Sequence, residues 1–180
     1  MDDLHSYSAD ETLRDGGAIH IRAIRPSDKE RLREHSMHLS TRSVYFRFLG
    51  PKKRLTDKDL ALFTDLDFVN RVALVVTLGR GEDEKIIGVG RYAIVSHDGD
   101  PVRSAELGFT VIDEHQKRGI GTLLLGHLLK IARAQQIQQF EAEVLADNAA
   151  MLGVFAKVAA RKTIQSGVAH VVFSTAESPN

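Results

Sequence analysis

The stretch Glu114–Leu124 reads EHQKRGIGTLL and carries the strongest structural signal in the chain. It follows an alternating apolar and polar run, Val102–Ile112, that predicts a strand. It opens the segment Gly119–Gln136, in which four apolar side chains recur with helical spacing: Ile120, Leu124, Leu128 and Ile131. The first amides of a helix have no partners within the helix and lie at the positive end of its dipole. The stretch therefore predicts a strand, a turn and a helix whose N-terminal end is open to an anion.

The residue types in this turn suit a phosphate group. Gly119 and Gly121 lack β-carbons, so a phosphate can approach the main chain closely. Lys117 and Arg118 add positive charge, and a guanidinium can pair a phosphate through two hydrogen bonds. Glycine in such a turn is also common for conformational reasons, and basic residues near a loop are usually solvated. The motif alone leaves a phosphate site and an ordinary turn as open alternatives.

A second glycine pattern, Gly88–Ala93, spells the dinucleotide-binding motif G-x-G-x-x-A. That motif requires a strand before the first glycine and a helix after the last. Here the glycines lie within a β-like run, Ile86–Val95, which leads to a D-G turn at His97–Asp100. We therefore interpret them as part of a crowded or bulged strand. The chain contains no P-loop pattern.

The remaining segments predict a mixed α/β domain in the order strand, helices, three strands, helix, strand, helix and terminal strands. The further predicted strands are Ala18–Arg25, Arg71–Leu78, Phe140–Leu145, and Thr163–Gln165 with Val168–Thr175 around a turn at Ser166-Gly167. The further predicted helices run from Ser27, with a capping box to Glu30, to about Leu39, from Ser40 or Thr41 to Phe48 before Gly50-Pro51, from Thr56 to about Leu66, and from Asp147 to about Ala160. We expect one folded domain over residues 18–176, preceded by a flexible acidic segment, Met1–Gly17.

Composition narrows the class of protein. The chain has 180 residues, a formal net charge of zero from 24 basic and 24 acidic side chains, and no cysteine. The charge balance argues against a nucleic-acid-binding protein, and the lack of cysteine excludes disulfides and a cysteine nucleophile. No apolar run approaches the roughly 20 residues that span a bilayer, and Met1–Gly17 lacks the apolar region of a signal peptide. We therefore expect a cytoplasmic protein.

The hexapeptide Gln116–Gly121, QKRGIG, matches the pattern Q/R-x-x-G-x-G/A of the GNAT superfamily of N-acetyltransferases. The strand before it, the helix after it and the Asn148 that opens the next helix also fit, so the resemblance covers Ala18–Thr175. Further stretches resemble the catalytic domain of bacterial Pat-type protein lysine acetyltransferases, namely Tyr45–Phe48 with Gly50-Pro51, Leu60–Thr64, Ala105–Val111 and Leu145–Asn148.

This resemblance implies a GNAT fold, in which helices flank a central mixed, mostly antiparallel sheet that is splayed where acyl-CoA binds. It also implies acetyl-CoA as the co-substrate. The pantetheine arm would pair with main chain at Val111 and Asp113, the diphosphate would bind amides of Arg118–Thr122, and Asn148 would contact the arm. The full set of implied cofactor-binding residues is Val111, Ile112, Asp113, Gln116, Lys117, Arg118, Gly119, Ile120, Gly121, Thr122 and Asn148.

Acylation of an amine needs a base, because a lysine with a pKa of about 10.4 is mostly protonated at neutral pH. Glu106 is the candidate, since it shares a strand face with the small residues Gly108 and Thr110, where a ligand fits. The resemblance places the catalytic glutamate of the Pat-type domains at the same position. The pattern alone also fits a solvent-facing acid. For Glu141 and Glu143, on the neighbouring strand, we favour that solvated interpretation.

The resemblance implies direct attack of the amine on the thioester in a ternary complex, because the chain has no cysteine to carry the acyl group. Many GNAT enzymes have a tyrosine acid in the helix after Asn148. This chain has Phe155 in that region, and we assign no general acid. We expect a protein lysine side chain as the acceptor. Two alternatives stay open: a small-molecule amine as acceptor, and a non-catalytic regulator that binds acyl-CoA.

Several other polar residues are weaker candidates. The basic run Arg42–Arg54 suits the 3′-phosphate of coenzyme A, an acidic patch on a protein substrate, or simple solvation. Tyr45 is a candidate for the acceptor cleft, and His115 for a cofactor contact. The histidines lack metal-site spacing, and we interpret the nearest pair, His35 and His38, as helix-surface residues. No metal site is expected.

Overall fold

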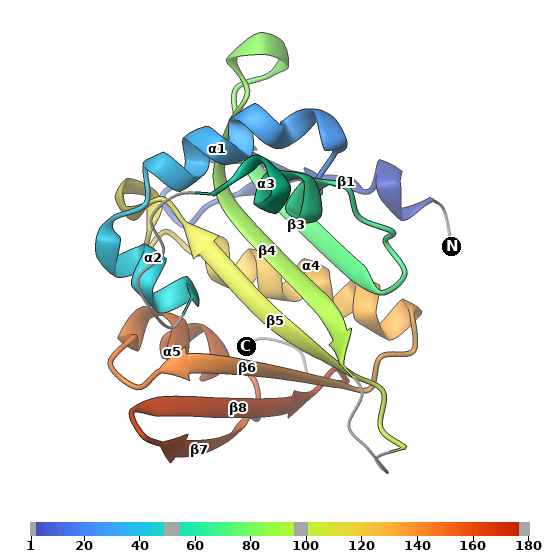
Figure 1. The fold of residues 1–180 in the computed structure, drawn as a ribbon, viewed down its shortest axis with the longest axis vertical. Coiled ribbons are helices and arrows are strands. Elements are labelled where there is room, and N and C mark those ends of the chain that lie inside the picture. The colour runs from blue at the N-terminus through green and yellow to red at the C-terminus, as the bar shows by residue number, and fades with distance from the viewer. Residues whose placement is uncertain (1–2, 49–54, 96–100, 177–180) are drawn as a thin grey trace.

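An eight-stranded sheet forms the centre of the computed structural model, which describes residues 3–48, 55–95 and 101–176 (Figure 1). Its strand order is β1-β2-β3-β4-β5-β6-β8-β7, and β5 and β6 pair in parallel whereas the other neighbours are antiparallel. The strands are β1 (Ser8–Thr12), β2 (Ala18–Ala23), β3 (Arg71–Leu78), β4 (Lys85–Val95), β5 (Ser104–Val111), β6 (Gln139–Leu145), β7 (Arg161–Gln165) and β8 (Val168–Ser174). This arrangement confirms the predicted mixed, mostly antiparallel sheet.

Helices cover both faces of the sheet. In Figure 1, α4 (Ile120–Ala134) runs behind the central strands, whereas α1 (Lys29–Met37) and α3 (Asp57–Thr64) lie in front of them. The short helices α2 (Thr41–Phe48) and α5 (Ala149–Phe155) lie near one end of β5 and β6. Within the described ranges, no helix combines the length and apolar character needed to cross a membrane.

Strand β3 lies inside the sheet and is covered on both faces. Its residues 72–77 are all buried, as the continuous apolar run predicts. The neighbouring β4 turns Gly88 and Gly90 toward α4, where a β-carbon on Gly88 would lie 2.9 Å from Ile120 Cγ2. A β-carbon on Gly90 would lie 3.2 Å from Leu128 Cδ1. These glycines let α4 approach the sheet closely, which confirms that the G-x-G-x-x-A pattern belongs to a strand.

The N-terminal segment differs from the expectation of a flexible tail. Ser8–Thr12 form the edge strand β1 and pair with β2 over five residues. Leu13, which follows, is 3% exposed and packs into the hydrophobic core. The sequence does not reveal this strand, because it is short and polar and every residue in it stays at least partly exposed.

Two helix boundaries also differ from the predictions. The expected start at Ser27 is wrong, since Pro26–Asp28 form the 3₁₀ turn η2 and α1 begins at Lys29. Helix α5 ends at Phe155, earlier than predicted. The predicted helix stop at Gly50-Pro51 and the predicted turn at His97–Asp100 lie outside the described residues.

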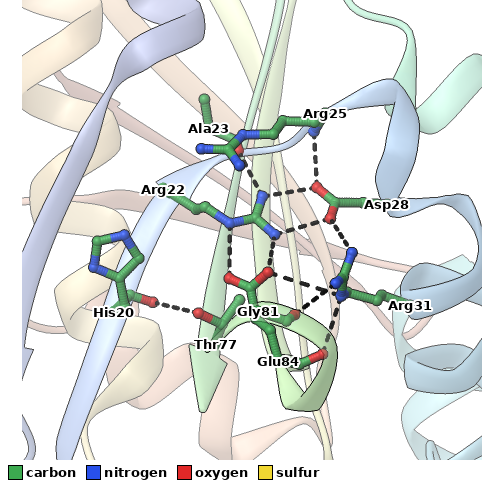
Figure 2. A network of polar contacts seen from close by, with 9 residues as sticks. All are labelled: His20, Arg22, Ala23, Arg25, Asp28, Arg31, Thr77, Gly81 and Glu84. Carbon is green, nitrogen blue, oxygen red and sulfur yellow. Dashed lines mark hydrogen bonds and ion pairs between the residues drawn. The ribbon is translucent and has the colours of Figure 1, made fainter. Parts of the chain in front are cut away.

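A buried ion-pair network explains why Asp28 occupies the η2 turn (Figure 2). Arg22 of β2 donates hydrogen bonds of 2.7 and 2.8 Å to Asp28, and two of 2.9 Å to Glu84. Arg31 of α1 donates a further bond of 3.0 Å to the main-chain carbonyl of Glu84. The network therefore ties together β2, the start of α1 and the loop between β3 and β4.

Electrostatics within this network favour the charged forms. Burial alone would lower the pKa of Arg22, but hydrogen bonds to Asp28 and Glu84 outweigh burial and raise that pKa. The hydrogen bond from Arg22 lowers the pKa of Glu84. Arg22 and Asp28 are 3% and 1% exposed, so neither charge has water as an alternative partner.

Replacing Arg22 by Met should lower the free energy of unfolding by about 3–5 kcal/mol, because Asp28 would stay buried with only Arg31, 3.6 Å away, to balance its charge. Urea unfolding at pH 7 measures this loss. Arg33→Met is the matched control, since Arg33 pairs with Glu30 and Asp57 at the surface, where ion pairs contribute little. Equal losses in the two variants would contradict the structural role of the buried network.

Candidate active site

Strands β5 and β6 pair over only three residues and then separate. Residues 104–106 pair with residues 139–141. Beyond Glu106, the pairing of β5 continues with β4 and that of β6 with β8. Figure 1 shows the two strands diverging toward the side where α2 and α5 lie. Main-chain groups on the facing edges are consequently left open to a ligand, because neither strand completes the hydrogen-bond ladder of the other.

A cavity of about 580 Å³ occupies this divergence, which is a size typical of ligand sites. Its walls come from both strands, from α2, from the turn between β5 and α4, and from α5. The sequence-predicted site residues that line it are Glu106, Val111, Asp113, Gln116, Lys117, Gly119, Ile120, Gly121, Thr122 and Asn148.

The turn between β5 and α4 opens the helix N-terminus toward the cavity. After the 3₁₀ turn η4 (Asp113–His115), Lys117 and Gly119 have positive φ angles of 61° and 98°. Gly119 is the N-cap of α4. Because glycine has no side chain, no side-chain hydrogen bond from the N-cap residue closes this end of the helix. The first amides of α4 therefore reach the cavity wall together with the positive end of the helix dipole, an arrangement that suits a phosphate.

Two side chains hold this turn against α2. Gln116 Nε2 donates to the carbonyl of Val111 at 3.0 Å and to Ser43 Oγ at 3.1 Å. The carboxylate of Asp113 accepts hydrogen bonds from the Ser40 amide and from both serine hydroxyls. Partial burial alone would raise the pKa of Asp113, but these hydrogen bonds outweigh it and lower the pKa. The turn is thus fixed in shape by groups outside it.

Two of the predicted cofactor residues, Ile112 and Arg118, do not line the cavity. Ile112 is 8% exposed and belongs to the core. The Arg118 side chain turns to Asp15, with an Nε–Oδ2 distance of 2.5 Å, and to His115, with an Nη1–Nδ1 distance of 2.8 Å. Its guanidinium is thus engaged by protein groups, unlike the phosphate contact that the sequence suggested. His115 itself lines the cavity.

Glu106 lies where β5 and β6 separate, and its exposed side chain lines the cavity. The side chain of Arg47, from α2, lies across Gly108. A β-carbon placed on Gly108 would be 2.7 Å from the Cζ atom of Arg47. Burial lowers the pKa of Arg47, whereas the nearby charge of Glu106 opposes this shift. Arg91 of β4 stacks on Phe63 at 4.4 Å, and burial together with repulsion from Arg47 lowers its pKa to about 9. One carboxylate and two guanidinium groups therefore meet beside Gly108.

The two rival acids on β6 have different surroundings. Glu141 is 8% exposed and lies 3.2 Å from His170 Nε2, so the expectation that it is solvated is wrong. Glu143 is exposed, as expected, although it also lines the cavity. Of these carboxylates, Glu106 and Glu143 have side chains at the cavity wall.

His35 is buried beneath the cavity floor, which corrects its interpretation as a helix-surface residue. Its Nδ1 lies 3.0 Å from the Ile86 carbonyl, and its Nε2 lies 2.9 Å from the hydroxyl of Thr110, a cavity-lining residue. Burial lowers the pKa of His35 to about 4, and the charges of Arg91 and His38 act in the same direction. The ring is therefore neutral, with Nδ1 donating to the carbonyl and Nε2 accepting from the hydroxyl.

Helix α5 forms a further part of the cavity wall. Asn148 Oδ1 accepts a hydrogen bond of 3.2 Å from the Met151 amide and caps the helix. Phe155 lines the cavity, is 2% exposed and packs edge-on against Phe109. A phenyl ring has no proton to donate, so no general acid is assigned in this helix. In the part of the chain that the structure describes, no group of His, Asp or Glu side chains is arranged to hold a metal ion.

The structure describes only part of the basic run Arg42–Arg54. Arg42 and Arg47 line the cavity; Arg42 is exposed, whereas Arg47 is partly buried. Tyr45 is 45% exposed and is not part of the cavity wall. The other basic residues of the run, Lys52, Lys53 and Arg54, lie outside the described residues.

Sequence reasoning missed Arg14, which lines the cavity from the turn between β1 and β2. The available signal was Asp15 followed by Gly16-Gly17, a combination typical of a tight turn between strands. Strand β6 contributes the wall at residues 142–144, in line with the splayed sheet that the resemblance implies.

The chain is similar in sequence and in structure to known acetyltransferases. The profile of the acetyltransferase (GNAT) family matches residues 39–159. The chain is 31% identical over 141 residues to the acetyltransferase PA5475 of Pseudomonas aeruginosa, which covers 78% of this chain and 74% of that protein. It is 31% identical over 148 residues to the acetyltransferase Pat of Mycolicibacterium smegmatis, with 82% of this chain and 43% of that protein covered. The crystal structure of the GNAT domain of S. lividans PAT matches with a TM-score of 0.84 and 38% identity, covering 93% of this chain and 96% of that one.

Burial of His35 should make stability depend on pH. Its pKa is about 4 in the folded protein against 6.5 for an ordinary histidine. Between these values the unfolded chain binds a proton at this residue and the folded protein does not, so stability falls as pH falls through this window, by up to about 3 kcal/mol. Urea unfolding at pH 7 and pH 5 measures the fall in wild type and in His35→Gln, where it should be smaller.

His38→Gln is the matched control, because His38 lies exposed on the same helix end. It should keep most of the wild-type dependence on pH, because the charge of His38 is the smallest of the contributions to the low pKa of His35. If His35→Gln also kept that dependence, the buried neutral state of His35 would be contradicted.

Proposed function

The chain belongs to the acetyltransferase (GNAT) family, and from this premise we propose that it transfers the acetyl group of acetyl-CoA to a lysine side chain of a protein, with Glu106 as the general base. The observation that carries the proposal is the position of Glu106. It lies where β5 and β6 separate and lines the same cavity as the uncapped N-terminus of α4. A candidate base and an anion-binding site therefore share one cavity.

The proposed cofactor position uses the groups that the fold leaves open. The diphosphate lies on the first amides of α4, from Arg118 to Thr122. The pantetheine arm follows the open edge of β5 toward Val111 and Asp113, and Asn148 contacts it from α5. The acetyl group then reaches the part of β5 that carries Gly108 and Glu106. This direction is supported by the cavity lining, which includes residues 106–111 of β5 and then Asp113, Gln116 and Lys117 of the turn.

In the proposed reaction, Glu106 accepts a proton from the acceptor ammonium, directly or through one water. The neutral amine attacks the thioester carbonyl, a C–N bond forms, the C–S bond breaks, and the nitrogen releases its second proton to solvent. Coenzyme A leaves as a thiolate, and its proton comes from solvent, because α5 supplies no acid. Holding both reactants in one cavity makes the attack effectively unimolecular.

A protein lysine is the favoured acceptor for two reasons. The stretches that resemble Pat-type domains include the Ala105–Val111 strand with Glu106, and the GNAT domain of S. lividans PAT is 38% identical to this chain. In addition, α2 lines the cavity with one face and exposes Tyr45 to 45% on the other. An exposed aromatic ring beside the cavity offers a contact to a protein surface.

Glu106→Gln should lower kcat/KM by about 10²–10⁴-fold, since the amide cannot accept the proton. It should still be stabilised by coenzyme A, because the diphosphate site is untouched; steady-state kinetics and thermal unfolding with coenzyme A measure the two effects. Glu143→Gln is the matched control, an acid of the same cavity wall that should stay active. Activity unchanged in Glu106→Gln would exclude it as the base.

The acceptor is tested by a screen with acetyl-CoA as donor. Acyl-CoA-synthetase-type proteins and small amines are supplied in parallel, and acetylated lysine is detected by mass spectrometry. We expect acetylation of protein lysines that depends on Glu106. Turnover with small amines alone would assign the enzyme to small-molecule acetylation, and binding of coenzyme A with no turnover on any acceptor would favour a non-catalytic regulator.

A further inference from the structure

The turn between β1 and β2 packs against the turn that precedes α4, although the two are about a hundred residues apart in the chain. Leu13 is 3% exposed, and its amide donates to the Gly17 carbonyl at 2.8 Å, which closes the turn. Asp15 Oδ2 lies 2.5 Å from Arg118 Nε, and the guanidinium of Arg118 also lies against Gly17. The hydrogen bond from Arg118 lowers the pKa of Asp15, so this carboxylate stays ionised.

These contacts fix the position of Arg14. It lies between the buried Leu13 and the ion-paired Asp15, so its main chain is held on both sides. Its side chain lines the cavity, with Nε 3.4 Å from the place that a β-carbon on Gly119 would occupy. Within the described residues, Arg14 has no hydrogen-bond or ion-pair partner. A guanidinium is thus presented at the N-cap of α4 without a protein anion to neutralise it.

The two arginines near this helix end have different surroundings. Arg118 belongs to the sequence motif, but its guanidinium contacts Asp15 and His115 and lies outside the cavity wall. Arg14 lies outside the motif and lines the cavity. A guanidinium near an uncapped helix N-terminus strengthens the binding of a phosphate there. Of the two arginines, Arg14 has the position from which it can make this contact.

We propose that Arg14 binds the diphosphate of acetyl-CoA, and that the Asp15–Arg118 ion pair positions it there. This inference rests on the proposed cofactor position along α4. The diphosphate is the expected partner because Arg14 lies over Gly119. The amides of Gly119 and its neighbours are the groups that would hold the diphosphate in the proposed cofactor position. The 3′-phosphate of coenzyme A is the alternative partner of the same chemistry.

The test is Arg14→Gln in the full chain, with isothermal titration of coenzyme A and steady-state kinetics with acetyl-CoA. We expect the Kd of coenzyme A and the KM of acetyl-CoA to rise about tenfold, with kcat little changed, because the lost contact acts equally before and during the reaction. The increase should shrink at high salt, because the contact is ionic and exposed. Arg161→Gln, which removes one positive charge from the far edge strand β7, is the matched control and should bind as wild type does.

A second arm identifies the phosphate. With 3′-dephospho-coenzyme A, the Arg14→Gln penalty should persist if the partner is the diphosphate. A penalty that disappears with this ligand would overturn the diphosphate assignment. Equal Kd values for Arg14→Gln and Arg161→Gln would overturn the role of Arg14 while leaving the cofactor site intact, whereas a wild-type protein that does not bind coenzyme A would overturn both.

Discussion

The separation of β5 from β6 after Glu106 is the constraint on which the site depends. Separating two strands inside a sheet normally loses hydrogen bonds along both edges. Here each strand keeps an antiparallel partner on its other side: β5 stays paired with β4 as far as Val111, and β6 stays paired with β8 as far as Leu145. The strands can therefore diverge without losing their extended shape. The edges that face each other become the walls of the cavity.

The end of the cavity near α4 is held by contacts from distant parts of the chain. Asp113 and Gln116 join the turn to the start of α2 through Ser40 and Ser43. Arg118 joins it to the hairpin of β1 and β2. An uncapped helix N-terminus keeps its amides free for a ligand only if something else holds the preceding turn in place. The side chains around this turn hold it in place, so the amides of the helix N-terminus remain free to bind a ligand.

The sequence predicts the elements whose signals are local. The apolar run of β3, the stripe of α4 and the glycine turn each depend on spacing within one segment, and all are found as predicted. The features that it missed depend on partners far along the chain. His35 meets Thr110 over 75 residues, and Arg118 meets Asp15 over 103. A polar side chain with a buried or distant partner looks the same in sequence as a solvated one, which is why Glu141 was misjudged.

The charges beside Glu106 bear on how an amine becomes reactive in the proposed reaction. Arg47 lies across Gly108, and Arg91 lies close enough to Arg47 for their charges to repel. A lysine ammonium that enters beside Glu106 meets the same repulsion, and like charges nearby favour the neutral form of an amine. The two arginines thus lower the free energy needed to remove the proton, while Glu106 offers the group that accepts it. The carboxylate attracts the ammonium and favours its charged form, whereas the guanidinium groups favour the neutral form, so in the proposed reaction Glu106 both draws the acceptor in and takes the proton that the arginines help to release.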